Sequence, residues 1–168
     1  MSAEEWRAIP GYEGIYEVSD LGRVRSLARI DAQGNRRSGK VLSPDVRPSG
    51  HLRVTLSLDG RTKRRWVHHL VLTEFVGPRP PDTEACHNDG NPANNTSSNL
   101  RWDTKSANAL DRVRHGNNHN ANKTHCPKGH PYIASNTYQN SSGWRLCRAC
   151  RLAREKAKRV QARQEEAA

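Results

Sequence analysis

Four residues near the C-terminal end have the types and spacing of a metal site. Cys126 and His130 form C-x3-H, Cys147 and Cys150 form C-x2-C, and residues 131–146 separate the two pairs. Each short pair can lie on a tight knuckle, and two knuckles can bracket one tetrahedral Zn²⁺ ion. His125 is an alternative to His130, but a ligand directly beside Cys126 would strain the knuckle. Few apolar residues lie between the ligands, so the sequence predicts a structural zinc ion rather than a catalytic one.

Residues 85–111, which read ACHNDGNPANNTSSNLRWDTKSANALD, contain a second group of side chains suited to chemistry. The pattern predicts a short strand that ends at His87, a polar loop, and a return strand at residues 100–102. Thr104 is a good N-cap, so a helix is expected over residues 105–114. The segment therefore predicts a strand, a loop, a second strand and a helix in close succession.

The order H-x-D-G-N-x-x-N-N-x-x-x-N-L-R-W-x-T-x-x-x-N resembles the HNH motif of the ββα-metal nucleases, in their homing-endonuclease branch. The resemblance implies that His87 is the general base, because imidazole is the side chain whose ordinary pKa lies closest to neutrality. It implies that Asn108 binds a catalytic Mg²⁺ or Mn²⁺ ion, which would neutralise the scissile phosphate and stabilise the leaving 3′ oxygen. Asn99 matches the middle asparagine and is expected to fix the loop, so that the His87 ring faces water.

The residue before the predicted base departs from this family, which commonly has Asp or His there as a second metal ligand. The chain has Cys86 instead. Thiolate is a soft ligand and Mg²⁺ a hard ion, so Cys86 is expected to be a small buried strand residue. The missing ligand could come from Asp89, from His68 or His69, or from water and DNA phosphate oxygens, and the sequence does not choose among them.

Residues 1–28 are predicted to form a small β module of short strands joined by glycine turns. Between Trp6 and Ser26 the chain reads W-x-x-I-x-G-Y-E-G-x-Y-x-V-S-x-x-G-x-V-x-S. This order resembles the modular motif found beside the nuclease domain in many phage and intron-encoded HNH endonucleases, which implies a DNA-contacting appendage. The aromatic residues Trp6, Tyr12 and Tyr16 are expected to pack in the core.

Residues 29–67 are predicted to continue as a β region, with a loop over 29–50 and a strand near Val41. Apolar and polar residues then alternate over residues 52–58, as in a half-buried strand, and Asp59-Gly60 predicts a hairpin turn. One face of this hairpin is expected to bury leucines and the other to meet phosphates, although a solvated, charged edge is the alternative. The predicted DNA-binding residues of the hairpin are Arg53, Lys63, Arg64 and Arg65. A short helix is expected over residues 68–76.

The charge of the chain favours a polyanionic partner. The chain has 28 Lys and Arg against 17 Asp and Glu, a net charge of +11, and its pI is about 10.1. Residues 1–84 have 14 basic and 11 acidic side chains, whereas residues 85–168 have 14 basic and 6 acidic ones. Duplex DNA is therefore the expected partner, and Arg101, Arg148 and Arg151 are its predicted contacts in the second half.

Hydropathy and the N-terminus argue against a membrane location. The mean hydropathy is −0.96, no apolar run reaches the length of a membrane span, and the first residues lack the pattern of a signal peptide. The cysteines are therefore expected to be reduced thiols in the cytoplasm of a bacterial or phage-infected cell, with no membrane partner.

Together these features predict an α+β protein with a small N-terminal β module, a ββα-metal (HNH) nuclease core, and a C-terminal zinc knuckle followed by a basic helix. The expected function is metal-dependent nicking or cleavage of duplex DNA by a monomeric, phage-encoded enzyme of the homing type. A DNA-binding protein that has lost cleavage is the alternative that Cys86 favours. An RNA-binding or ribosome-associated zinc protein explains the charge but not the order of His87, Asn99 and Asn108. The predicted segments are 1–28, 29–67, 68–115, a linker at 116–124, 125–152 and 153–168.

Overall fold

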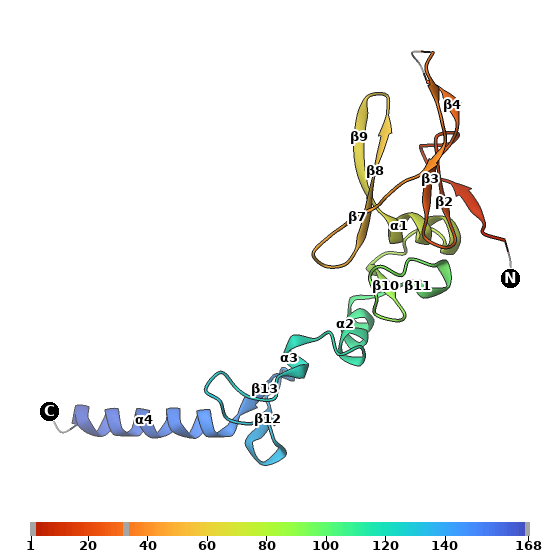
Figure 1. The fold of residues 1–168 in the computed structure, drawn as a ribbon. Helices are drawn as coiled ribbons and strands as arrows, with labels where there is room; N and C mark the ends of the chain where they lie inside the picture. The colour runs from red at the N-terminus through yellow and green to blue at the C-terminus, as the bar shows by residue number, and fades with distance from the viewer. Residues whose placement is uncertain (1–2, 32–33, 167–168) are drawn as a thin grey trace. The chain divides into compact units, whose positions relative to one another are not determined.

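The computed structural model describes residues 3–31 and 34–166. Residues 1–2, 32–33 and 167–168, which fall within three of the predicted segments, lie outside the described residues. The chain divides into two compact units, residues 1–117 and 118–168 (Figure 1). As predicted, the fold is mixed, with small sheets and few helices.

The N-terminal part of the first unit is a four-stranded antiparallel sheet with the order β1-β2-β3-β6. Its strands are β1 (Trp6–Ala8), β2 (Tyr16–Ser19), β3 (Val24–Ser26) and β6 (Lys40–Val41). The short strands expected over residues 1–28 are confirmed. The segment 29–50, which was expected to be mostly loop, also contains β4 (Arg29–Ile30) paired with β5 (Arg36–Arg37), as well as β7 (Asp45–Val46).

A second antiparallel sheet has the order β7-β8-β9. β8 (Leu52–Leu58) and β9 (Arg61–Trp66) form the predicted hairpin, and the turn residues Asp59 and Gly60 both have positive φ, 49° and 73°, as a type I′ turn requires.

The expected separation of apolar and basic faces in this hairpin is wrong. Lys63 lies opposite Leu56, and Arg65 lies opposite Val54, whereas Arg64 lies opposite Thr55. Cross-strand partners share a face, so the basic residues of β9 are divided between both faces. They are nevertheless exposed on both faces of this edge strand.

The helix expected over residues 68–76 is shorter and continues in a different form. α1 (Val67–Val71) passes into the π-helical turn η1 (Leu72–Val76), which ends where the Gly77 N–H donates to the Leu72 carbonyl at 2.9 Å. The Gly77 carbonyl accepts a hydrogen bond from the Trp102 indole N–H at 2.9 Å. This bond ties the turn to the strand that follows the polar loop.

The predicted strand, loop, strand and helix are confirmed. β10 (Thr83–His87) pairs antiparallel with β11 (Leu100–Thr104), and the turn η2 (Ser97–Asn99) precedes β11. α2 (Lys105–Arg114) begins at the expected cap, since the Thr104 hydroxyl accepts a hydrogen bond from the Ala107 N–H at 3.2 Å.

One hydrophobic core joins the three parts of the first unit. It contains Tyr16 and Val18 from the N-terminal sheet, Leu56 from β8, Val71 from α1 and Leu100 from β11, all buried. The Tyr16 hydroxyl also accepts a hydrogen bond from the Ser57 N–H at 3.2 Å. The N-terminal sheet is therefore packed into the same core as the strands and helices that follow it.

The second unit has little core of its own. It contains α3 (His119–Asn122), the turn η3 (Ala134–Asn136), the hairpin of β12 (Thr137–Gln139) and β13 (Arg145–Cys147), and the long helix α4 (Arg148–Glu166). Most side chains described on α4 are exposed. None of the helices in the described ranges has the length and apolar character needed to cross a membrane.

Because the core is shared, we expect Leu56→Ala to destabilise the N-terminal sheet and the ββα unit together. Leu56 is fully buried, and removal of such a side chain costs about 2–5 kcal/mol of the free energy of unfolding. Amide hydrogen exchange should accelerate by the same factor at Val18 and at Val71. Val46→Ala, on the neighbouring strand but 64% exposed, should change stability by about 0.5 kcal/mol or less. Faster exchange confined to β8 would show that the parts fold independently.

Candidate active site and metal centre

His87 lies at the end of β10, and one hydrogen bond fixes its ring. Its Nε2 atom lies 3.1 Å from Oδ1 of Asn95, whose side chain is buried in the polar loop. The Asn95 amide nitrogen donates to the Ala93 carbonyl at 3.3 Å, which turns the amide oxygen toward the ring. Nε2 must therefore carry the proton, and Nδ1 keeps a lone pair that can accept one.

Asn99 organises the loop rather than contacting His87. Its amide nitrogen donates to Oδ1 of Asp89 and to the Asn94 carbonyl, both at 2.9 Å. Its amide oxygen accepts a hydrogen bond from the Asp89 N–H at 3.1 Å. Asn99, directly before β11, thus holds the loop at Asp89 and at Asn94. The direct partner of His87, Asn95, was missed by sequence reasoning. Its place among several polar loop residues gave no signal that it reaches the histidine.

The Asp89 carboxylate is occupied by donors from the loop. It accepts hydrogen bonds from the Asn91 N–H at 2.8 Å and from the Asn94 amide at 2.7 Å, besides the one from Asn99. These bonds, the Asn91 N–H foremost, lower the pKa of Asp89 to about 2. Asp89 is therefore ionised at neutral pH. Metal binding by Asp89 stays a prediction.

Two further histidines pack around His87. The rings of His51 and His68 lie 5.7 and 5.5 Å from the His87 ring, centroid to centroid, and 5.2 Å from each other. Burial, with smaller effects from neighbouring histidines, lowers the pKa of His68 to about 3, and burial also lowers the pKa of His51. The His68 side chain that packs beside His87 is therefore uncharged at neutral pH. His69, the other alternative metal ligand, contacts the Trp102 ring at 5.7 Å.

The opposite face of β10 carries different chemistry. Cys86 is buried as expected, and burial raises the pKa of its thiol. Glu84 lies two residues earlier and so on the same face, where its carboxylate accepts a hydrogen bond from the Asn108 amide nitrogen at 2.8 Å. Sequence reasoning missed Glu84, although strand alternation places it beside the position of Cys86. The pair offers a carboxylate and an amide oxygen, which are ligands suited to hard divalent ions.

Arg101 is part of the internal support of the ββα unit. Its guanidinium pairs with Asp103 at 2.9 Å and with the buried Asp111 of α2, and it also donates to Asn88. These contacts fasten α2 to β11. Contact of Arg101 with DNA stays a prediction. A DNA phosphate would have to compete for the guanidinium with its partners within the protein.

The other predicted DNA-binding residues differ in their surroundings. Arg53 pairs with Asp45 at 2.6 Å and lies over the Trp66 ring. The basic residues of β9 are exposed: Lys63, Arg64 and Arg65. In the second unit, Arg148 and Arg151 lie 5.7 and 5.5 Å from the Tyr138 ring, and Arg151 also pairs with Glu155 at 2.8 Å. Their contacts with DNA stay predictions.

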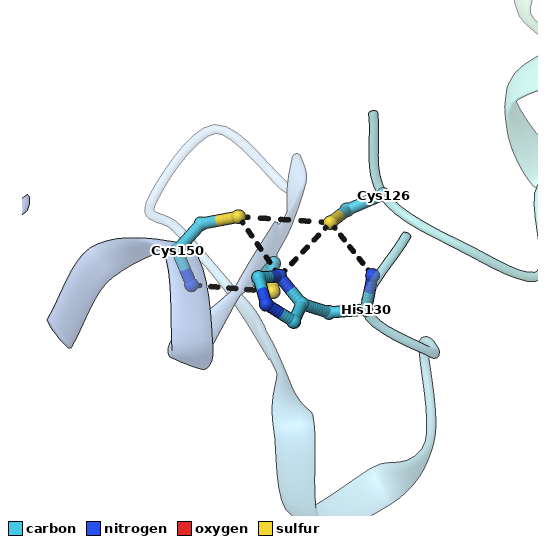
Figure 2. A group of neighbouring side chains, drawn as sticks. Cys126, His130 and Cys150 are labelled. Carbon is cyan, nitrogen blue, oxygen red and sulfur yellow. Dashed lines mark hydrogen bonds between the residues drawn. The ribbon is translucent and has the colours of Figure 1, made fainter. Parts of the chain in front are cut away.

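The four predicted zinc ligands come together in the second unit, and His130 rather than His125 joins the cluster. Figure 2 shows the sulfur and nitrogen atoms turned toward one another. Cys126 Sγ lies 3.6 Å from Cys150 Sγ, and His130 Nδ1 lies 3.4 and 3.3 Å from these two atoms. All four ligand atoms, including Cys147 Sγ, lie within 4.8 Å of one another. Ligands of a tetrahedral zinc ion lie about 3.5–3.8 Å apart, so the cluster fits that ion.

Both knuckles direct N–H groups at sulfur. The His130 N–H donates to Cys126 Sγ at 3.3 Å, and the Cys150 N–H donates to Cys147 Sγ at 3.5 Å. The Asn136 amide, at the turn before β12, donates to Cys147 Sγ at 3.4 Å. Desolvation and the neighbouring thiols raise the pKa of Cys150 to about 11. A cation in the site would stabilise the Cys150 thiolate and so offset its desolvation.

Comparisons with known proteins agree with this geometry. The NUMOD4 motif family matches residues 4–57, and the HNH endonuclease family matches residues 65–110. DNA endonuclease I-HmuI of Bacillus phage SP01 is 37% identical over 112 residues, which make up 67% of this chain and 59% of the relative. The uncharacterized HNH endonuclease L245 of Acanthamoeba polyphaga mimivirus is 31% identical over 137 residues, 82% of this chain and 37% of the relative.

A solved structure, described as DNA binding and cleavage by the HNH homing endonuclease I-HmuI, has the same fold. Its TM-score is 0.57 at 35% identity, and the match covers 68% of this chain and 60% of that chain. The chain thus spans about three fifths or less of the length of these relatives. The chain carries a NUMOD4 motif at residues 4–57 followed by an HNH endonuclease domain at residues 65–110.

Proposed function

We propose that the chain is a metal-dependent HNH endonuclease that hydrolyses phosphodiester bonds of duplex DNA. The observation that carries the proposal is the hydrogen bond between His87 Nε2 and Asn95 Oδ1, from which we infer that Nδ1 keeps its lone pair. The ring lies at the end of β10, in the strand, loop, strand and helix of an HNH endonuclease domain. An imidazole held in this way can take a proton from water near neutral pH.

The proposed catalytic step follows from the hydrogen bonds of these side chains. Nδ1 of His87 takes a proton from the attacking water, while Asn95 keeps the ring in the required tautomer and Asn99 and Asp89 keep the loop in place. A bound Mg²⁺ or Mn²⁺ ion would neutralise the scissile phosphate and stabilise the leaving 3′ oxygen. Asn108 and Glu84 are the residues that would hold this ion, with Glu84 supplying the carboxylate that the position of Cys86 lacks. The products would carry 3′ hydroxyl and 5′ phosphate ends.

The substrate and setting are proposed from the charge and the relatives. The net charge of +11 favours a polyanion, and I-HmuI is by name a DNA endonuclease. We propose that the chain acts as a monomer, on duplex DNA, in the cytoplasm of a bacterial or phage-infected cell. Homing-type action, by nicking or by a double-strand cut, is part of the same proposal.

A DNA-binding protein that no longer cuts is the second candidate. Cys86 favours it, because a buried thiol with a raised pKa is a poor ligand for Mg²⁺. The two candidates predict the same DNA affinity but opposite results in a cleavage assay.

For the second unit we propose a structural zinc ion. The four ligand atoms form a closed set, and most residues around them are exposed. The unit therefore buries too little apolar surface to fold without the free energy of metal binding.

The His87→Ala variant tests the proposed function. With supercoiled plasmid and Mg²⁺ or Mn²⁺, we expect the cleavage rate to fall by about a hundredfold to ten-thousandfold, the usual value of positioned proton transfer. DNA affinity should stay within about twofold of the native protein, because one neutral imidazole adds little to many phosphate contacts. His119→Ala, in α3, is the matched control and should cut at the native rate. A native protein that never nicks plasmid with either ion would favour the non-cutting candidate.

The Glu84→Gln variant tests the proposed metal ligand. We expect the affinity for Mn²⁺, measured by electron paramagnetic resonance on protein loaded with zinc, to fall by about tenfold or more. Raised Mn²⁺ should partly restore cleavage by mass action. Glu13→Gln, outside the site, should bind Mn²⁺ like the native protein. Unchanged Mn²⁺ affinity in Glu84→Gln would remove Glu84 from the ligand set.

The Cys147→Ser variant tests the zinc site. Protein purified without added zinc should contain about one equivalent by elemental analysis, and the variant should lose it. Hydrogen exchange should then rise across residues 125–152 but not in the ββα unit. Cys86→Ala removes the remaining cysteine and should keep its zinc. Full zinc retention in Cys147→Ser would contradict the assignment.

A further inference from the structure

A turn of the NUMOD4 motif lies directly against the active-site loop. Gly22, between β2 and β3, has φ of +79°, and a Cβ atom placed on it would lie 2.7 Å from Asn95 Cβ and 2.8 Å from the Asn95 carbonyl oxygen. Such distances leave no room for a side chain, and the obstructing atoms are backbone and Cβ, which cannot rotate away. Next to this contact, the Ser97 N–H donates to the Asp20 carbonyl at 2.7 Å.

The turn is itself firmly held. The Gly22 N–H donates to the carbonyl of the fully buried Ser19 at 3.0 Å, and the Ser19 hydroxyl accepts the Arg23 N–H at 3.0 Å. Asp20 forms two hydrogen bonds with Glu5, the residue before β1. Its Oδ1 accepts the Glu5 N–H at 3.0 Å, and its N–H donates to the Glu5 carbonyl at 3.1 Å. The surface that Asn95 meets is therefore rigid.

Asn95 is confined between this turn and the histidine. It is 3% exposed, with Gly22 on its Cβ side and His87 at its amide oxygen. A second glycine lies close against the same loop. A Cβ atom placed on Gly50 would lie 2.6 Å from Cγ of Pro92. Both glycines lie outside the strands and helix of the ββα unit, so the loop is supported by residues that precede that unit.

We propose that the Ser19–Gly22 turn of the NUMOD4 motif is a positioning element of the active site, which holds Asn95 against His87 by the close approach of Gly22 and the Asp20–Ser97 hydrogen bond. The role in cleavage rests on the proposed function. The motif thereby acts on the rate of the chemical step, besides any contact it makes with DNA. A shift of the loop by about 1 Å would move the His87 lone pair off the attacking water, and misplacement on that scale costs about a hundredfold in rate.

The test compares two glycines of the same motif. Gly22→Ala and Gly14→Ala both place alanine at positive φ, +79° and +71°, but nothing lies within 4 Å of a Cβ on Gly14. Backbone strain is thus common to both variants, and only Gly22→Ala pushes on Asn95. We expect the single-turnover rate on supercoiled plasmid with Mn²⁺ to fall by about tenfold to a hundredfold in Gly22→Ala and by less than about twofold in Gly14→Ala. DNA affinity should be equal in the two variants.

A spectroscopic measurement separates this proposal from the proposed function. The Nε2 proton of His87 should give a slowly exchanging NMR resonance in the native protein and in Gly14→Ala, because Asn95 accepts its hydrogen bond. Gly22→Ala should lose or broaden that resonance at a temperature at which both variants are fully folded by circular dichroism, although its thermal midpoint should lie below that of Gly14→Ala because of the added overlap with Asn95. The resonance needs no cleavage, so it can be read even if the native protein does not cut.

Ser97→Pro provides a second variant if Gly22→Ala does not fold. Ser97 is the first residue of η2, where proline fits, and the preceding Thr96 is extended with ψ of 141°. The substitution removes the N–H that Asp20 accepts, and we expect the same loss of rate and of the His87 resonance. Native rates and an unchanged resonance in Gly22→Ala or Ser97→Pro would overturn the proposal.

Discussion

The proposed active site depends on the hydrogen bond between His87 and Asn95. An imidazole can present either nitrogen to water, and this bond decides which one keeps its lone pair. The bond requires Asn95 to stay in one orientation, which the Ala93 carbonyl and the close approach of Gly22 enforce. The loop in turn keeps its shape through the Asn99 and Asp89 bonds. Amide side chains, together with the ionised Asp89 carboxylate, thus fix the ring of the proposed base.

The alternation of side chains along β10 separates His87 from the pair of Glu84 and Asn108. His87 points to the face where neutral, buried His68 forms a wall. Glu84 points to the face covered by α2, where Asn108 meets it. The proposed base and the proposed metal ligands thus lie on opposite faces of one strand. The ion pair between Arg101 and the buried Asp111 fastens α2 to β11. The cluster of Cys126, His130, Cys147 and Cys150 belongs to a separate compact unit.

Local signals in the sequence predicted the elements better than the contacts between them. The Thr104 cap, the Asp59-Gly60 turn and the spacing of the zinc ligands each depend on residues close in the chain, and the structure has all three. The π-helical turn after α1 was missed, because its hydrogen bond and the Trp102 contact with Gly77 depend on packing. The predicted separation of apolar and basic faces in the hairpin was wrong because its register places basic residues of β9 on both faces.

The missed site residues share one physical cause. Asn95, Glu84 and Gly22 act through partners that are distant in the chain or hidden among similar residues, so residue type and spacing alone gave no signal. Gly22 was recognised as part of a motif, but its close approach to Asn95 exists only in the folded unit. Recognition of the family supplied roles for His87 and Asn108, whereas the structure supplied their neighbours.

The tautomer of His87 in the native protein tests the central claim most directly. Long-range ¹H–¹⁵N NMR correlations of the imidazole distinguish the nitrogen that carries the proton from the one that does not. At neutral pH we expect a protonated Nε2 and an unprotonated Nδ1. A ring protonated at Nδ1, with Nε2 free, would contradict it, because the base would then face Asn95 instead of water.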